Sequence, residues 1–188
     1  GALREGIITS QFPAPSGAAG TLITGVFLMP SDTDDIRFLK RALELAREGS
    51  QRGEGGPFGA VLVKDGQIIA EGWNRVVASH DPTAHAEIAA IRTAAIALGN
   101  FHLHGCTLYA SSEPCPMCLS AAYWAQLERV VYANPRHIAA EIGFSDADLY
   151  QELTAPPANR RLPLIRIELP DADAVMHAWR DTPGHIDY

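Results

Sequence analysis

The first long pattern of apolar residues in the chain has helical spacing. Apolar side chains recur at positions 36, 39, 43 and 46, which lie on one face of a helix because the intervals are three and four residues. The preceding Ser31-Asp32-Thr33-Asp34-Asp35 supplies short polar and acidic side chains that stabilise helix N-termini. The pattern therefore predicts an amphipathic helix that runs to about Gly49.

Shorter apolar segments separated by turn residues follow this helix. Asp65-Gly66 between two apolar runs indicates a hairpin, and Gly99-Asn100 ends a second helical period. The resulting order α, β, β, α, β, α, β is typical of a layered α/β domain. The elements predicted after the first helix are strands at 58–64 and 67–72, a helix at 83–98, a strand at 107–110, a helix at 115–125, strands at 129–132 and 164–169, and a last helix at 171–180.

Residues 1–30 have a different composition from the rest. They are rich in Ala, Gly, Ser, Thr and Pro, which predicts an extension outside a catalytic core at 31–188. The apolar run Leu22–Met29 is too short for a membrane span, has no basic flank and lacks a convincing cleavage site. We therefore expect neither a membrane anchor nor a signal peptide in this segment.

Composition narrows the class of protein. With 188 residues, 47% of them hydrophobic, the chain can bury a core and is expected to be one soluble domain. The formal net charge of -7 provides no basic surface for a polyphosphate and so disfavours nucleic acid as a partner. Three cysteines, two of them in Cys115-Pro116-Met117-Cys118, fit a metal or redox site in the reducing cytoplasm better than a disulfide framework.

Two short motifs carry the candidate chemistry. Cys115 and Cys118 are three residues apart at a predicted helix start, where the helix amides favour thiolates that can share a metal ion. His85 at the start of another predicted helix would complete a three-ligand zinc site, one zinc per chain, with the fourth position open for water. A lone Cys-x-x-Cys also occurs in redox pairs and structural zinc sites, but the His85-Ala86-Glu87 motif favours catalytic zinc. Cys106 is expected to be a buried apolar residue.

Glu87 has a separate expected role. It is too close to His85 in sequence to be a useful fourth ligand, yet it can face a water at the open position and carry its proton. The combination His-x-Glu and Pro-Cys-x-x-Cys is the known signature of zinc-dependent nucleobase deaminases.

With these motifs in place, the chain resembles the cytidine deaminase-like superfamily and, within it, the short bacterial guanine deaminases. The resemblance implies a three-layer α/β/α fold with a central five-stranded mixed sheet, and hydrolytic deamination of guanine to xanthine with release of ammonia. The segments that carry it, besides the zinc motifs, are Gly55-Gly56-Pro57-Phe58-Gly59-Ala60-Val61, Asn74, Asp81-Pro82-Thr83-Ala84, Tyr123-Trp124-Ala125, Gly143-Phe144-Ser145-Asp146 and the tail that ends in Tyr188.

The same resemblance implies a role for individual residues. It assigns zinc to His85, Cys115 and Cys118 and the proton shuttle to Glu87. It also implies a homodimer in which the C-terminal segment is exchanged between subunits, so that its last residue caps the partner's site. The residues implied to contact substrate are Asn74 and Asp146 on the purine edge, Phe58 and Trp124 as aromatic walls, Ala86, and Tyr188 as the cap. Glu141 and Glu152 could assist proton movement, although each could equally be an acid on the solvated surface.

Several alternatives stay open at this point. A tRNA adenosine deaminase shares the zinc residues, but the acidic charge and few basic residues in the last third disfavour it. Deaminases of other aminopurines, cytosine or aminotriazines act on similar edges, and Ser145 departs from the Asp frequent in the resembled family. A non-catalytic zinc-stabilised binding module is a more distant alternative, against which Glu87 argues because structural zinc does not need it.

Overall fold

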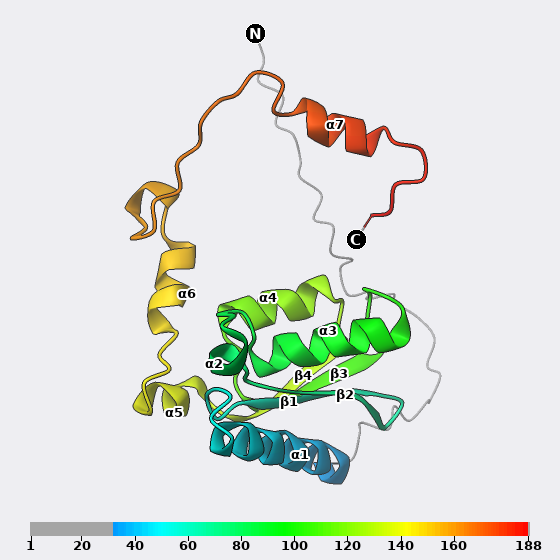
Figure 1. The fold of residues 1–188 in the computed structure, drawn as a ribbon, viewed down its shortest axis with the longest axis vertical. Coiled ribbons are helices and arrows are strands. Elements are labelled where there is room, and N and C mark those ends of the chain that lie inside the picture. Colours follow the sequence, from blue (N-terminus) through cyan, green and yellow to red (C-terminus); the bar gives the residue numbers. More distant parts are fainter. Residues whose placement is uncertain (1–31, 188) are drawn as a thin grey trace, which may run out of the picture.

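The computed structural model describes residues 32–187, so the proposed extension 1–30 and Tyr188 lie outside the described residues. A single α/β unit forms the core, and the chain continues past it as an extended C-terminal arm (Figure 1). The elements in chain order are α1 (Asp32–Gln51), β1 (Gly59–Lys64), β2 (Gln67–Trp73), α2 (Val76–Ser79), α3 (Ala86–Leu98), β3 (Cys106–Ser112), α4 (Pro116–Trp124), β4 (Arg129–Asn134), α5 (Arg136–Glu141), α6 (Ala147–Thr154), a 3-10 turn (Pro157–Asn159) and α7 (Ala174–Arg180).

A mixed sheet with the order β2-β1-β3-β4 is the centre of the fold. Strand β1 pairs antiparallel with both β2 and β3, whereas β3 and β4 run parallel. The hairpin between β1 and β2 turns at Asp65 and Gly66, both with positive φ, as the sequence predicts. The parallel pair requires a crossover, and α4 supplies it between β3 and β4.

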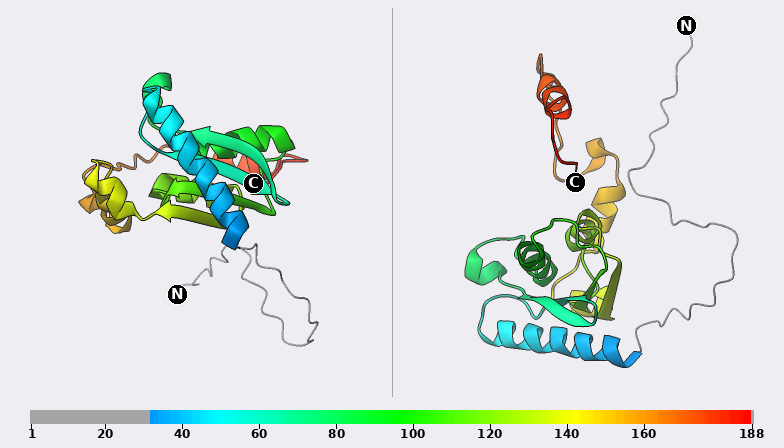
Figure 2. Two further views of the ribbon diagram at one scale, coloured as in Figure 1. Left: turned by 90° about the horizontal axis from the view of Figure 1, so that it is seen from below. Right: turned by 90° about the vertical axis from the view of Figure 1, so that its right-hand side faces the viewer.

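Helices cover both faces of the sheet. Helix α1 lies on one face and helices α3 and α4 on the other, giving three layers (Figures 1 and 2). Alternate residues of β1 point to opposite faces: Val61 and Val63 join Phe38 under α1, while Ala60 and Leu62 join the core under α3. Cys106, buried in the second of these cores, confirms the prediction for this residue.

Close approach of α3 to the sheet depends on Gly72. A Cβ at this position of β2 would lie 2.3 Å from the carbonyl oxygen of Ala86 and 2.7 Å from the backbone nitrogen of Ala90. These distances are shorter than a van der Waals contact, so only glycine permits α3 to sit this low. The first turn of α3 is thereby brought to the edge of the sheet.

The predicted fifth strand at 164–169 is wrong. The described residues form a four-stranded sheet, and this segment is extended, exposed and without ladder partners. Its alternating apolar residues favour a strand, but a strand also needs an adjacent edge, and here the chain after α6 has left the core (Figure 1).

Other boundaries differ from the predictions by a few residues. The helix expected at 83–98 begins at Ala86, because the Asp81 carboxylate accepts hydrogen bonds from the Thr83 amide and hydroxyl and holds a turn there. The last helix starts at Ala174 rather than at 171. Helices α2, α5 and α6 were not predicted, since each is too short or too polar to show a clear period.

None of the helices within residues 32–187 is both long enough and apolar enough to cross a membrane.

Candidate active site

One edge of the sheet collects the residues with candidate chemistry. Because β1 is antiparallel to β2 and β3, the start of β1 lies at the same edge as the ends of β2, β3 and β4. Phe58 precedes β1, Asn74 follows β2, and Cys115 follows β3. These segments, with the start of α3, surround one cavity of about 360 Å³, a volume in the range of small-molecule sites.

Two helix N-termini converge on this cavity with the predicted metal ligands. His85 is the N-cap of α3, Cys115 is the N-cap of α4, and Cys118 lies in the first turn of α4. The His85 Nδ1 atom is 3.6 Å from Cys115 Sγ and 3.5 Å from Cys118 Sγ. All three ligand atoms lie within 4.8 Å of one another.

This donor set fits zinc. For tetrahedral zinc with bond lengths of roughly 2.0 Å to nitrogen and 2.3 Å to sulfur, the N···S separation is about 3.6 Å. The distances to the two sulfur atoms, 3.6 and 3.5 Å, agree with that value. Three ligands of this kind also leave a fourth position for water, as catalytic zinc sites do. His85, Cys115 and Cys118 are therefore the residues that could hold the metal.

The environment shifts the pKa values of the two thiols in opposite directions. A hydrogen bond from the Cys118 thiol, together with the neighbouring His85, lowers the pKa of Cys115 to about 4. Donation to Cys115, together with burial, raises the pKa of Cys118. The bond to Cys115 also raises the pKa of His85. The lowered pKa favours the thiolate form of Cys115, which is the form that binds a metal cation.

Glu87 lies directly beside the ligand set. It follows His85 in the first turn of α3, lines the cavity and is 7% exposed. Burial raises the pKa of its carboxyl above the ordinary value. A carboxyl with a raised pKa accepts a proton more readily than an ordinary carboxylate and can return it, which is the property required of a proton shuttle.

The backbone fixes the orientation of the Asn74 amide. Its Oδ1 accepts hydrogen bonds from the backbone amides of Gly56 at 3.3 Å and Val76 at 3.2 Å. The amide Nδ2 is therefore the group left to donate into the cavity that Asn74 lines. Gly55 permits this arrangement, because a Cβ there would lie 2.1 Å from Asn74 Oδ1.

Asp146 and two aromatic rings complete the cavity. Asp146 lies just before α6, and burial raises the pKa of its carboxyl. The Phe58 ring packs against the Phe144 ring in an edge-to-face pair with centroids 5.0 Å apart, and both rings line the cavity. An aromatic wall together with a carboxylate and an amide in one cavity suits a planar heterocycle that carries N–H groups.

Some predicted site residues lie elsewhere. Trp124, at the end of α4, is 64% exposed and does not line this cavity. Glu141 is an exposed residue at the end of α5, and Glu152 on α6 is paired with Arg161 at 3.1 Å. Ala86 is fully buried in the core behind the ligands, where it packs rather than borders the cavity. Their proposed roles stay predictions.

Several residues that line the cavity were not predicted from the sequence. Phe144 was noted only as part of the segment Gly143-Phe144-Ser145-Asp146, and the sequence around Glu113 and Arg136 does not distinguish these residues from ordinary surface charges. Arg136 follows β4 and reaches the cavity because the carboxyl ends of β3 and β4 meet at the same edge. The parallel pairing of β3 and β4 would have indicated that Arg136 lies at the cavity, but this pairing is known only from the fold.

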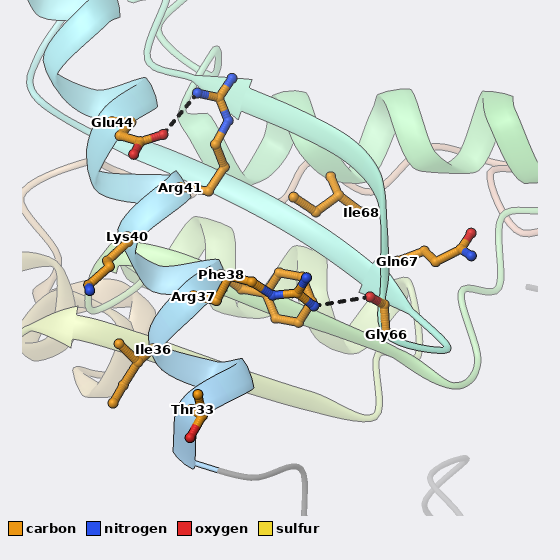
Figure 3. A pocket seen from close by; sticks show the side chains of 10 residues that line it. All are labelled: Thr33, Ile36, Arg37, Phe38, Lys40, Arg41, Glu44, Gly66, Gln67 and Ile68. Atoms are coloured by element: carbon orange, nitrogen blue, oxygen red, sulfur yellow. Dashed lines mark hydrogen bonds and ion pairs between the residues drawn. The ribbon is translucent and has the colours of Figure 1, made fainter.

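A second hollow lies on the α1 side of the sheet, between this helix and the hairpin of β1 and β2 (Figure 3). Both of its arginines make structural contacts: Arg41 binds Glu71 at 2.7 Å, and Arg37 donates to the carbonyl of Gly66 at 3.5 Å. None of the described residues that line this hollow is a His or a Cys. The chemistry of the described residues is therefore concentrated at the other site.

Comparisons with known proteins agree with this site. Residues 32–134 match the family described as the cytidine and deoxycytidylate deaminase zinc-binding region. The match spans more than half of the chain and includes His85, Glu87, Cys115 and Cys118. The chain thus belongs to a family of zinc-binding deaminases.

Individual relatives extend the comparison beyond the zinc motifs. The guanine deaminase of Bacillus subtilis is 51% identical over 151 residues, which cover 80% of this chain and 97% of that protein. Its crystal structure superposes with a TM-score of 0.80 at 50% identity, covering 81% of this chain and 98% of that one. A tRNA-specific adenosine deaminase of Haemophilus influenzae is 43% identical, but the match covers 58% of this chain and 63% of that protein. The chain is therefore a member of the cytidine deaminase-like family of zinc-binding deaminases, and 80% of it matches nearly the whole length of a guanine deaminase in that family.

Proposed function

We propose that this protein is a zinc-dependent guanine deaminase that hydrolyses guanine to xanthine and ammonia. The observation that carries the proposal is the cavity in which His85, Cys115 and Cys118 converge with Glu87. It occurs in a chain that matches 97% of the Bacillus subtilis guanine deaminase at 51% identity. The proposal extends to this chain the activity named for that relative.

Zinc held by the three ligands would supply an acidified water and polarise the reacting centre. Glu87 accepts a proton from the attacking water and delivers it to a ring nitrogen of the purine, which makes C2 a better electrophile. After attack, Glu87 takes the remaining proton from the new C2 hydroxyl and passes it to the amine as the C2–N bond breaks. The raised pKa of Glu87 suits this use in two protonation states.

Recognition of the base is assigned to the cavity wall. Guanine stacks on the Phe58 and Phe144 side of the cavity, where the two rings pack 5.0 Å apart. Asn74 donates to an acceptor through Nδ2, because its Oδ1 is held by two backbone amides. Asp146 accepts from N–H groups on the edge of the purine.

The C-terminal arm supports a homodimer as part of this proposal. From residue 161 onward the arm extends away from the core and is exposed along almost its whole length (Figures 1 and 2). An apolar surface of this extent calls for a partner, and exchange between two copies would cover it and bring Tyr188 to the second site. The exposed apolar residues of the arm are Leu162, Leu164, Ile165, Ile167, Leu169, Val175, Met176, Trp179 and Ile186. Light scattering should find a dimer, and removal of residues 162–188 should yield a monomer.

Residues 31–188 form the proposed catalytic unit, and residues 1–30 the proposed extension. Deletion of 1–30 should leave kcat/KM for guanine unchanged, and a loss of activity would show that the extension belongs to the catalytic unit.

A cytoplasmic location is proposed because Cys115 and Cys118 are free cysteines that would bind zinc as thiolates, and a reducing compartment keeps such cysteines reduced.

A tRNA adenosine deaminase is the second candidate, favoured by the 43% identical relative from Haemophilus influenzae. A panel of guanine, adenine, cytosine, cytidine, aminotriazines and a tRNA anticodon stem-loop separates the candidates. We expect the highest kcat/KM with guanine, with ammonia and xanthine released in equal amounts. Turnover of the stem-loop without turnover of guanine would falsify the proposed substrate.

A further inference from the structure

Arg136 occupies a place at the cavity that the proposed mechanism does not use. It is the first residue of α5, directly after β4, and it lines the cavity. Its backbone amide donates to Glu113 Oε2 at 3.1 Å, which ties the start of α5 to the segment that leads into the zinc ligands. The start of α5 is thus anchored to the part of the core that holds the metal.

The side chain of Arg136 reaches a different element. Its guanidinium carbon lies 4.8 Å from the centre of the Tyr150 ring on α6, within the distance of a cation–π contact. Tyr150 is one helical turn after Asp146, and its amide donates to the Asp146 carbonyl at 3.2 Å. A chain of contacts therefore runs from Glu113 through Arg136 and Tyr150 to Asp146.

This chain of contacts connects α6 to the core. Helix α6 has no fully buried residue. The segment that leads into it passes through Gly143 with a φ of 95°, a backbone conformation open to glycine and strained for other residues. The distance of Asp146 from the zinc ligands is consequently sensitive to each contact that pins α6.

Charge around the cavity also singles out Arg136. It is the one Arg or Lys among the described residues that line the cavity, while Glu87, Glu113 and Asp146 supply acids. Burial raises the pKa of Asp146, and the charge of Arg136 acts in the opposite direction. Arg136 therefore favours the ionised carboxylate, which is the form that accepts hydrogen bonds from a purine edge.

We propose that Arg136 is a positioning residue for the substrate: stacked on Tyr150, it holds Asp146 at the cavity in the place that binds the base. The inference rests on the proposed function, because it concerns recognition of the same purine. A planar guanidinium serves this role better than an ammonium group, since it can lie flat on an aromatic ring.

The test is a double-mutant cycle on the full-length zinc enzyme. Arg136→Ala should raise KM for guanine by about 10-fold with kcat within about 2-fold, because Asp146 contributes binding in both ground and transition states. Arg136→Lys should give an intermediate KM. In the Asp146→Asn background, Arg136→Ala should change KM by less than about 2-fold, since coupled residues are non-additive. Equal effects of Arg136→Ala in both backgrounds, or an unchanged KM in the first, would overturn the proposal.

Arg37→Ala is the matched control. Arg37 also lies over an aromatic ring, 4.5 Å from the centre of Phe38, but on the hollow on the α1 side of the sheet (Figure 3). Its replacement should leave both KM and kcat unchanged. Zinc content and melting temperature of all variants should match the wild type, so that a folding defect is recognised as such.

Hydrogen exchange separates this inference from the proposed activity. Amides of residues 147–154 should exchange faster in Arg136→Ala than in the wild type, whichever nucleobase the enzyme deaminates. Unchanged exchange in α6 would overturn the positioning role even if guanine is the substrate. Absence of guanine turnover by the wild type would instead count against the proposed function alone.

Discussion

Replacement of Gly72 by alanine tests how closely the metal site depends on the depth of α3. The new Cβ would lie 2.3 Å from the Ala86 carbonyl oxygen and 2.7 Å from the Ala90 amide nitrogen, both backbone atoms that cannot rotate away. Restoring ordinary contact requires α3 to rise by about 1 Å, because the close-packed interior offers no other space. The first turn of α3 carries His85 and Glu87, so both would move relative to the ligands on α4.

The expected loss follows from that displacement. Overpacking of this kind costs about 1–3 kcal/mol of folding free energy. A misplacement of about 1 Å in a catalytic constellation can reduce the rate by roughly 100-fold. Gly72→Ala should therefore lower kcat/KM for guanine by about that factor and weaken zinc binding, since His85 would no longer lie 3.5–3.6 Å from both sulfur atoms.

The assay compares Gly72→Ala with Val63→Ala. Val63 is buried under α1 on the opposite face of the sheet, so its truncation should cost about 2 kcal/mol without moving α3. Both variants should melt at lower temperature, and only Gly72→Ala should lose activity and zinc when measured well below its melting temperature. Wild-type kcat/KM in folded Gly72→Ala would refute the argument that this contact sets the position of the ligands.

Three further predictions concern charged groups. Glu87→Gln should retain zinc but lose roughly 100- to 10,000-fold in kcat, and loss of zinc from this variant would identify Glu87 as a ligand. In the wild type, kcat/KM should rise with pH as the buried Glu87 carboxyl, whose pKa is raised, ionises. After removal of the metal, iodoacetamide at neutral pH should modify Cys115 before Cys118, because the pKa of Cys115 is lowered to about 4 and that of Cys118 is raised. Mass spectrometry that finds Cys118 modified first would contradict these opposite pKa shifts. Burial opposes ionisation of Asp35, but hydrogen bonds from Tyr109 and Arg129 outweigh this effect and lower its pKa, so Asp35→Asn should cost about 2 kcal/mol of unfolding free energy at pH 7. Because the folded pKa is below the unfolded value, the difference in unfolding free energy between wild type and variant should shrink as pH falls below about 4. A difference that does not change with pH would refute this role of Asp35.

The metal site was predictable because its chemistry is local in sequence. His85-Ala86-Glu87 and Cys115-Pro116-Met117-Cys118 each place their side chains through one helix start, and only the meeting of two helix starts had to be supplied by the fold. The hairpin at Asp65-Gly66 was predictable for the same reason, since both residues adopt the positive φ that this turn requires.

The remainder depends on contacts between distant segments. Phe144 and Arg136 reach the cavity only because β4 lies parallel to β3 and the chain then returns through α5. The strand expected at 164–169 has the right alternation, yet an alternating segment becomes a strand only beside an open edge. Trp124 has the residue type of a pocket wall but is exposed at the end of α4.

The most direct measurement of the central claim is a zinc titration of metal-free protein followed by guanine turnover. We expect the rate to rise linearly to one zinc per chain and then to stay constant, with xanthine and ammonia formed in equal amounts. Alanine at Cys115 should abolish the rise, because one of the three converging ligands is lost. Guanine turnover by the metal-free protein, or no turnover at full zinc occupancy, would contradict it.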